Sequence, residues 1–148
     1  LALFNYFNKL YIGDSGSYII GFLLGYILLQ IYVKYPYFSP YFIALLLWYP
    51  VFEILFSIIR KIKINKSPLK PDNNHLHHLL FLYIEKKFKF KTITSNNITS
   101  ILIIAYNLLI FLIAAQNIYS TSLNVLLFSL NILIYLVTYS KLNHLKKL

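Results

Sequence analysis

Long apolar runs separated by shorter segments that carry most of the charge make up this chain. The apolar runs lie at about residues 17–33, 41–59, 98–115 and 123–139. At ~1.5 Å of rise per residue, a helix of this length crosses roughly 25 to 28 Å, which is close to the hydrocarbon thickness of a bilayer. The pattern therefore predicts an all-α integral membrane protein with about four transmembrane helices.

Two glycines, one proline and the segment between the spans add detail to the first two predicted spans. Gly21 and Gly25 are four positions apart, a spacing that lets a neighbouring helix approach closely, and helix packing is the interpretation we favour. Pro50 predicts a kink in the second span, because proline removes one backbone donor and crowds the preceding turn. Prolines and tyrosines in segment 34–40 predict a turn at the level of the lipid headgroups.

A basic loop at 60–97 is expected between the second and third spans. Nine of the 14 Lys and Arg residues lie between 60 and 91, against one at 34–40 and none at 116–122. Because basic loops stay on the cytoplasmic side of a membrane, we predict that this loop and both ends of the chain are cytoplasmic.

Two segments of this basic side have patterns of their own. Segment 73–87 places leucines and a tyrosine on one helical face, which predicts a helix lying at the membrane interface. Segment 141–147 is lysine-rich and is expected to form a basic tail.

Composition narrows the class of protein. Apolar residues make up 59% of the chain, which is too much for a soluble domain with a water-facing surface. The net charge of +10 does not indicate nucleic-acid binding, because the basic residues are confined to blocks between the apolar runs. The absence of cysteine excludes disulfides and thiolate chemistry, so Asp, Glu and His must supply any acid–base or ion-binding groups.

Asp14 lies in the sequence Gly13-Asp14-Ser15-Gly16-Ser17, a glycine-rich turn that leads into the first span. Two glycines let the backbone bend, and the free N–H groups at a helix start, with Ser17 as a candidate cap, attract anions such as phosphate. A carboxylate beside an anion site favours Mg²⁺, which prefers one or two carboxylates plus substrate phosphates. The alternative is a turn that only caps a helix.

Three histidines within four residues form the second motif, His75-Leu76-His77-His78. If Asp72 or Asn74 caps a helix here, His75 and His78 share one face near its positive end, ready for phosphate or a nucleotide. A metal site is the rival interpretation, but the spacing is not the His-Glu-x-x-His pattern of zinc proteases. The third alternative is that these histidines line a hydrated loop and have no function in binding or catalysis.

Glu53 is an ionisable group inside a predicted span, which is a functional hypothesis by default. Snorkelling to the interface or pairing with Arg60 would explain it equally well. Arg60, Lys66 and Lys70 would draw phosphates inward, and anchoring of the cytoplasmic loop is the alternative for each. Glu85 is predicted to lie on a solvated helix face.

These motifs, in this order and with these spans between them, resemble the family that transfers N-acetylhexosamine-1-phosphate from a UDP-sugar to undecaprenyl phosphate. The residues that carry the resemblance are Asn5, Ile12-Gly13-Asp14-Ser15-Gly16-Ser17, Gly21, Pro50, the acid at 53, Arg60, Ser67-Pro68, Asp72 and His75-Leu76-His77-His78. The His-Leu-His-His form looks like the branch that starts O-antigen, enterobacterial common antigen, teichoic acid or capsule synthesis, more than the peptidoglycan branch. Two positions depart from the family pattern: Glu53 stands where Asp is usual, and Asn73 where a basic residue is common.

The resemblance implies phosphoryl transfer with Mg²⁺ or Mn²⁺ as cofactor. Its implied site consists of the catalytic residues Asp14, His77 and His78, the substrate-binding residues Gly13, Ser15, Gly16, Arg60 and His75, and Asp14 as the metal ligand. The implied partners are UDP-N-acetylhexosamine, undecaprenyl phosphate and membrane lipid, with no nucleic acid. The implied setting is the bacterial cytoplasmic (inner) membrane, and the implied processes are cell wall biogenesis and lipopolysaccharide biosynthesis.

In this family a paired-aspartate motif and a Gly-rich loop precede the Gly-Asp motif, and the chain begins too late to contain them. We therefore expect the C-terminal portion of a multi-pass transferase, with half of the active site absent and no activity alone. Two other hypotheses stay open: a non-catalytic membrane subunit or degenerate relative, and a histidine-based metal transporter or protease. Mg²⁺ or Mn²⁺ dependence with a UDP-sugar favours the transferase, whereas Zn²⁺ binding to His75 and His78 favours the last hypothesis.

Overall fold

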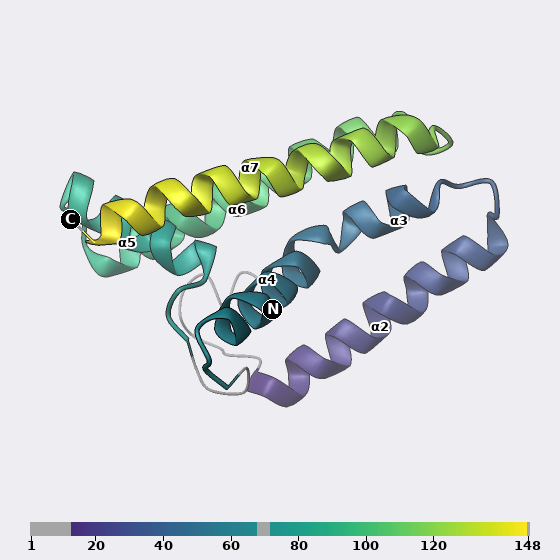
Figure 1. Cartoon of the computed structure of the whole chain (residues 1–148). Helices are drawn as coiled ribbons and strands as arrows, with labels where there is room; N and C mark the ends of the chain where they lie inside the picture. Colours follow the sequence, from purple (N-terminus) through teal and green to yellow (C-terminus); the bar gives the residue numbers. More distant parts are fainter. Residues whose placement is uncertain (1–12, 68–71, 148) are drawn as a thin grey trace.

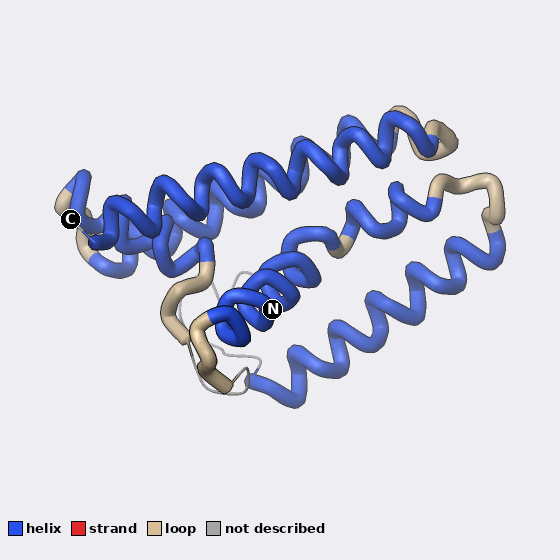
Figure 2. The backbone as a smooth tube through the Cα atoms, viewed as in Figure 1, coloured by secondary structure: helices blue, strands red, loops and turns tan. Residues whose placement is uncertain are grey.

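The computed structural model describes residues 13–67 and 72–147, and within these ranges it contains helices and no strands (Figures 1 and 2). The helices are α2 (Gly13–Lys34), α3 (Pro40–Leu46), α4 (Trp48–Lys63), α5 (Leu76–Phe88), α6 (Thr92–Ala115) and α7 (Thr121–Lys147). The predicted all-α class is confirmed for the described part of the chain.

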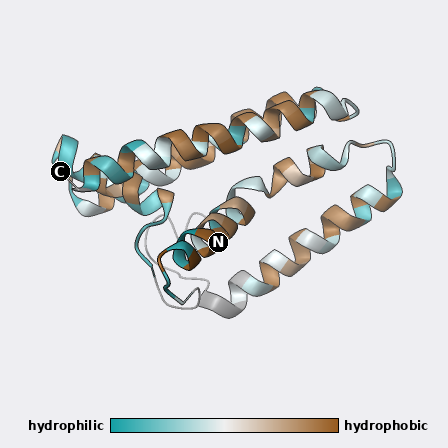
Figure 3. Ribbon diagram, viewed as in Figure 1, coloured by the Kyte–Doolittle hydropathy of each residue, from teal (hydrophilic) through white to brown (hydrophobic). Residues whose placement is uncertain are grey.

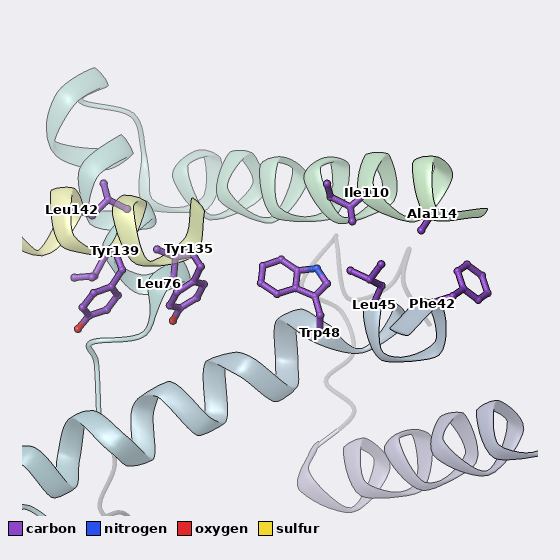
Figure 4. Packing of buried hydrophobic residues seen from close by; sticks show 10 residues of the cluster. Phe42, Leu45, Trp48, Leu76, Ile110, Ala114, Tyr135, Tyr139 and Leu142 are labelled. Atoms are coloured by element: carbon purple, nitrogen blue, oxygen red, sulfur yellow. The ribbon is translucent and has the colours of Figure 1, made fainter. Parts of the chain in front are cut away.

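Helices α6 and α7 lie side by side as an antiparallel pair, and both α3 and α5 pack against them (Figure 1). The buried apolar side chains form one row along this pair, and α3, α4, α5, α6 and α7 all contribute to it (Figure 4). Its members are Phe42, Leu45, Trp48, Leu76, Leu79, Ile110, Ala114, Tyr135, Tyr139 and Leu142. This row fixes α5 and the last turns of α7 next to each other.

The predicted kink in the second span is confirmed, and it is a break between two helices. The axes of α3 and α4 differ by 76°, with Leu47 between them. Pro50 has no N–H to donate to the carbonyl of Leu46, and its ring crowds that turn. The Leu47 N–H donates instead to the Ala44 carbonyl (3.3 Å), and regular helix resumes where the Val51 N–H donates to the Leu47 carbonyl (3.2 Å).

Two helices, α6 and α7, are long and apolar enough to cross a membrane. The bent pair α3–α4 makes a third if it is one span, and the described apolar part of α2, Tyr18–Lys34, is shorter. The middles of α6 and α7 are hydrophobic, whereas hydrophilic residues gather at the C-terminal end of α7 and around α5 (Figure 3). The described residues thus hold two or three candidate spans.

Some predicted boundaries shift in the structure. Gly13–Ser17 is the first part of α2 and not a turn before it. The helix predicted at 73–87 within the loop 60–97 is confirmed as α5, while α6 begins at Thr92 and not at about residue 98. Segment 141–147 is not a tail but the end of α7, where lysines are favoured by the negative end of the helix dipole.

The predicted close approach at Gly21 and Gly25 is not made by any described residue. A Cβ added to either glycine would have no neighbouring atom within 4 Å. Gly25 instead lines an apolar groove of about 590 Å³ between α2 and the bent pair α3–α4. Among residues 13–67 and 72–147, no neighbour therefore covers the small face of α2 at these two glycines.

The two sparsely charged turns lie at one end of the molecule. The Ser39 N–H, before α3, donates to the Ile118 carbonyl, after α6 (2.8 Å). The basic residues of α5 and of the last turns of α7 lie toward the other end (Figure 3). The basic segments and the sparsely charged turns thus lie at opposite ends of the described bundle, and their orientation in the membrane stays a prediction.

Candidate functional site

The segment before α5 is held against the last turns of α4 by Arg60. The guanidinium of Arg60 forms an ion pair with Asp72 and donates to the Asn74 carbonyl (2.6 Å). The other Asp72 oxygen, Oδ1, accepts from the Asn74 N–H (3.0 Å). Because the side chains of Arg60 and Asp72 are only 15% and 12% exposed, this charge-assisted contact is partly shielded from water.

Arg60 also ties α4 to α7. Its guanidinium donates to the Tyr139 hydroxyl (2.9 Å) and more weakly to the Ser57 Oγ (3.4 Å). It lies over the rings of Tyr139 and Phe56, at 5.5 and 5.9 Å from their centroids. The guanidinium of Arg60 is thus occupied by contacts within the protein, and its predicted substrate-binding role stays a prediction.

Asp72 is charged at neutral pH. Burial alone would raise its pKa, but the Asn74 N–H and the Arg60 guanidinium outweigh that effect and hold the pKa of Asp72 below its ordinary value. The ion pair at this position therefore persists through the physiological range.

Glu53 supplies the cap of α5 from another helix. Its Oε1 accepts from the Leu76 N–H (3.0 Å) and lies 3.0 Å from Nδ1 of His75. The Glu53 side chain is only 8% exposed. The α5 N-terminus carries unpaired N–H groups and a partial positive charge, both of which stabilise this buried carboxylate. Glu53 does not pair with Arg60, the alternative left open by the sequence, because the two contact different parts of one segment.

The N-cap of α5 is His75, and not Asp72 or Asn74 as the sequence suggested. The His75 side chain does not accept a hydrogen bond from the first turn of α5. The Glu53 carboxylate does so instead, from the Leu76 N–H. Asp72 instead closes the turn before the helix through Asn74.

All three histidine rings come together. The ring centroids of His75 and His78 are 6.4 Å apart, as expected for neighbours on one face, and the His77 ring lies 5.5 Å from His75 and 4.5 Å from His78. Burial, followed by the nearby His78 and His75 rings, lowers the pKa of His77. His77 is therefore neutral at neutral pH and is able both to donate and to accept a hydrogen bond.

His77 and His78 open onto a groove of about 730 Å³ between α5 and α6. The remaining lining is polar nearest the start of α6 and apolar further along it: Phe81, Thr92, Ile93, Asn96, Thr99, Ser100, Ile103 and Ile104. Imidazole, amide and hydroxyl groups in such a wall suit a polar ligand that carries oxygen atoms.

The described residues do not form a metal centre. Within residues 13–67 and 72–147, no group of three or more His, Asp or Glu side chains could hold an ion. Glu53 caps α5 and Asp72 binds Arg60, so neither carboxylate is open to Mg²⁺. The rival zinc interpretation of His75 and His78 gains no support from this part of the chain.

The Gly-Asp motif is only partly described. Gly13, Asp14 and Ser15 begin α2, but their side chains lie outside the described residues, and Gly16 is half-buried in the same turn. Their predicted roles, including Asp14 as the metal ligand, stay predictions. Asn5, Pro68 and Lys70, which the sequence also singled out, lie outside the described residues.

Curated relatives match about half of the chain. An undecaprenyl-phosphate alpha-N-acetylglucosaminyl 1-phosphate transferase of Thermotoga maritima is 35% identical over 85 residues, covering 57% of this chain and 27% of the relative. The Escherichia coli K12 protein of the same name is 33% identical over 73 residues, covering 49% and 20%. A decaprenyl-phosphate N-acetylglucosaminephosphotransferase of Mycolicibacterium smegmatis is 34% identical over 84 residues, covering 49% and 21%.

The chain has homologues among the undecaprenyl-phosphate N-acetylglucosaminyl 1-phosphate transferases. The matched segment spans only about a fifth to a quarter of the length of these transferases. No family model and no solved structure matches the chain. The transferase homologues agree with the resemblance drawn from the Gly-Asp and histidine motifs.

The sequence did not reveal two contributors from α7. Lys146 donates from its Nζ to the Asn74 Oδ1 (2.6 Å), and Tyr139 accepts from Arg60. Both partners lie more than 70 residues away along the chain, at separations of 72 and 79. A lysine near a helix end and a tyrosine in an apolar run carry no local signal for such contacts.

Proposed function

We propose that this chain is part of an enzyme that transfers N-acetylhexosamine-1-phosphate from a UDP-sugar to undecaprenyl phosphate and releases UMP. The observation that carries the proposal is the cluster of His75, His77 and His78, fixed by α4 at the polar end of an otherwise apolar helix bundle. The names of the homologous transferases support the same reaction.

The proposed reaction is a phosphoryl transfer. A phosphate oxygen of undecaprenyl phosphate attacks the phosphorus that bears the sugar, and the bond from that phosphorus to the oxygen of UMP breaks. His77 and His78 would hold phosphate or sugar oxygens by hydrogen bonds, since neutral imidazole both donates and accepts. A divalent ion, Mg²⁺ or Mn²⁺, held by Asp14 would neutralise the negative charge of the phosphates.

In the membrane, the proposed protein has four spans in this region: α2, the bent pair α3–α4, α6 and α7. The histidine cluster would face the cytoplasm, because the basic residues gather at its end of the molecule. A cytoplasmic site gives access to the water-soluble UDP-sugar, and the neighbouring apolar helices give access to the prenyl chain. The lipid-linked product would lie in the bacterial inner membrane and would be the first intermediate in the synthesis of a cell-envelope polysaccharide.

A transfer assay on the polypeptide that carries this chain tests the proposal. Vesicles containing it receive undecaprenyl phosphate, Mg²⁺ and labelled UDP-N-acetylhexosamines, and lipid-linked sugar phosphate and UMP are measured. His77→Ala, His78→Ala and Asp14→Asn are each expected to lower turnover about a hundredfold or more. His144→Ala, at an exposed position on α7, is the matched control and should retain activity.

Two results would contradict the proposal. One is the absence of lipid-linked product with every UDP-N-acetylhexosamine offered, as a non-catalytic subunit would give. The other is wild-type turnover in the three variants of His77, His78 and Asp14.

A further inference from the structure

Two charged residues of α4 hold opposite ends of the segment that leads into the histidine motif. Arg60 holds Asp72 and the carbonyl of Asn74, while Glu53 holds the N–H of Leu76 and the ring of His75. Positions 53 and 60 are about two helical turns apart, roughly 10 Å along the axis. The rigid helix α4 therefore sets the length and direction of this segment.

The contact with Glu53 also constrains the chemistry of His75. Oε1 of Glu53 accepts the Leu76 N–H at the start of α5, so it acts there as a hydrogen-bond acceptor. A carboxylate oxygen only accepts hydrogen bonds, so Nδ1 of His75, at 3.0 Å, must carry the proton that joins them. Only Nε2 of this ring is then left to meet a ligand.

We propose that Glu53 is a positioning residue, which fixes the tautomer and the orientation of His75 and so presents Nε2 to the phosphate or sugar oxygens of the substrate. The inference rests on the proposed transfer function and adds a residue to which the sequence gave only a structural or an open role. Because the His77 ring stacks on His75 with 13° between their planes, the effect of Glu53 extends to the rest of the cluster.

The burial of the Glu53 side chain indicates that its contact with His75 has a function. The side chain is 8% exposed, so its charge has little access to water and must be offset by the protein. An apolar residue would fill the same space between α4 and α5 without that desolvation cost. Capping of α5 accounts for one of the two contacts of this carboxylate oxygen, and orientation of His75 accounts for the other.

The tautomer is tested first, by ¹⁵N NMR of histidine-labelled protein at alkaline pH, where imidazole is neutral. Free imidazole side chains favour the proton on Nε2, whereas the proposal requires the His75 proton on Nδ1. The His75→Gln variant assigns the signal. A His75 with its proton on Nε2 in the wild-type protein overturns the proposal, whatever the activity.

Variants then separate the effect of Glu53 from that of folding. Glu53→Gln keeps the size of the side chain and removes the charge, and Glu53→Leu removes both acceptors. In Glu53→Leu the His75 proton is expected to move to Nε2. Glu85→Gln is the matched control, because Glu85 is an acid near the other end of α5 that accepts a hydrogen bond from the Thr92 hydroxyl.

Activity provides the second measurement. Glu53→Leu is expected to lower kcat/KM for the UDP-sugar roughly 10- to 100-fold, as loss of an orienting partner does, while Glu85→Gln keeps wild-type kcat/KM. Glu53→Gln keeps one oxygen acceptor for His75 and should lose less activity than Glu53→Leu. Wild-type kcat/KM together with an unchanged tautomer in Glu53→Leu would refute the proposal. If the wild-type protein transfers no sugar phosphate, the proposed function fails, and the tautomer still decides whether Glu53 orients His75.

Discussion

Individual side chains in this protein act through residues far away in the sequence. Arg60 has three partners beyond its own helix, namely Asp72 and Asn74 before α5 and Tyr139 on α7, and Glu53 serves as a cap for a helix that begins 23 residues later. Arginine suits this position better than lysine, because its planar guanidinium presents several donors in fixed directions. The charges within the apolar bundle thus organise the start of α5, where the histidines lie.

The protonation of His77 gives a prediction at this scale. Burial first, and His78 next, lower the pKa of His77 below its ordinary value of about 6.5. The folded protein therefore binds this proton less readily than the unfolded chain, so the contribution to stability is present above about pH 6.5 and is lost as the pH falls below it. In His78→Gln the pKa of His77 should rise toward its ordinary value.

A ¹⁵N titration of the three histidines measures this change. His144→Gln, which alters an exposed histidine on α7, serves as the control and should leave the titration of His77 where it was. A His77 pKa that is already ordinary in the wild-type protein, or that falls further in His78→Gln, would show that the stacked rings do not interact as described.

At the scale of helices, hydrophobic periodicity and proline explain most of what the sequence predicted correctly. The apolar runs became α2, α6 and α7, and the kink at Pro50 became the break at Leu47, because local sterics decide both features. The N-cap of α5 was mispredicted because the capping carboxylate comes from Glu53, across a helix and a loop. The lysines at 141–147 suggested a tail, yet they extend α7 because α5 packs beside its last turns.

The break between α3 and α4 leads to a second prediction. Pro50→Ala restores the missing N–H and removes the ring, which favours a continuous helix by about 3 kcal/mol. We expect the two helices to straighten and the 76° bend to decrease. Since Glu53 and Arg60 follow the break, both would leave the histidine segment, and transfer should fall about a hundredfold.

Spin labels at the exposed positions Tyr41 and Ile62 report the bend through the distance between them. This distance should increase in Pro50→Ala. Pro40→Ala is the control, because a proline at the first position of a helix replaces an N–H that would have no helical partner. An unchanged distance in Pro50→Ala would show that packing of α3 against α6 and α7, and not the proline, holds the bend.

The molecule as a whole has a charged end and a nearly uncharged end. Arg60, the basic residues of α5 and Lys146 belong to the first, and the turn bonded from Ser39 to Ile118 belongs to the second. Sequence alone predicted this separation from the loop charges. Sequence alone could not predict how the charged end is assembled. The contacts of Arg60 and Lys146 form only because α7 packs back against α5 in the folded protein.

The orientation of the two ends is a third prediction. In a background without other cysteines, a cysteine at Ser67 should react with a membrane-impermeant thiol reagent only from the cytoplasmic side. A cysteine at Ser120 should react only from the outside. Permeabilised cells provide the control in which both positions react. Labelling from the opposite sides would place the histidine cluster away from the UDP-sugar and remove the basis of the proposed reaction.

The contacts between α7 and the histidine segment impose an order on biosynthesis. Tyr139 and Lys146 are made 79 and 72 residues after their partners Arg60 and Asn74. At about 5 to 20 residues per second, a ribosome needs roughly 4 to 16 s to cover that interval. During this time the histidine segment has emerged without its α7 partners, and two more helices have still to enter the membrane. These contacts therefore form only after α7 has been made, and a nascent chain that stalls before α7 lacks the hydrogen bonds with Tyr139 and Lys146.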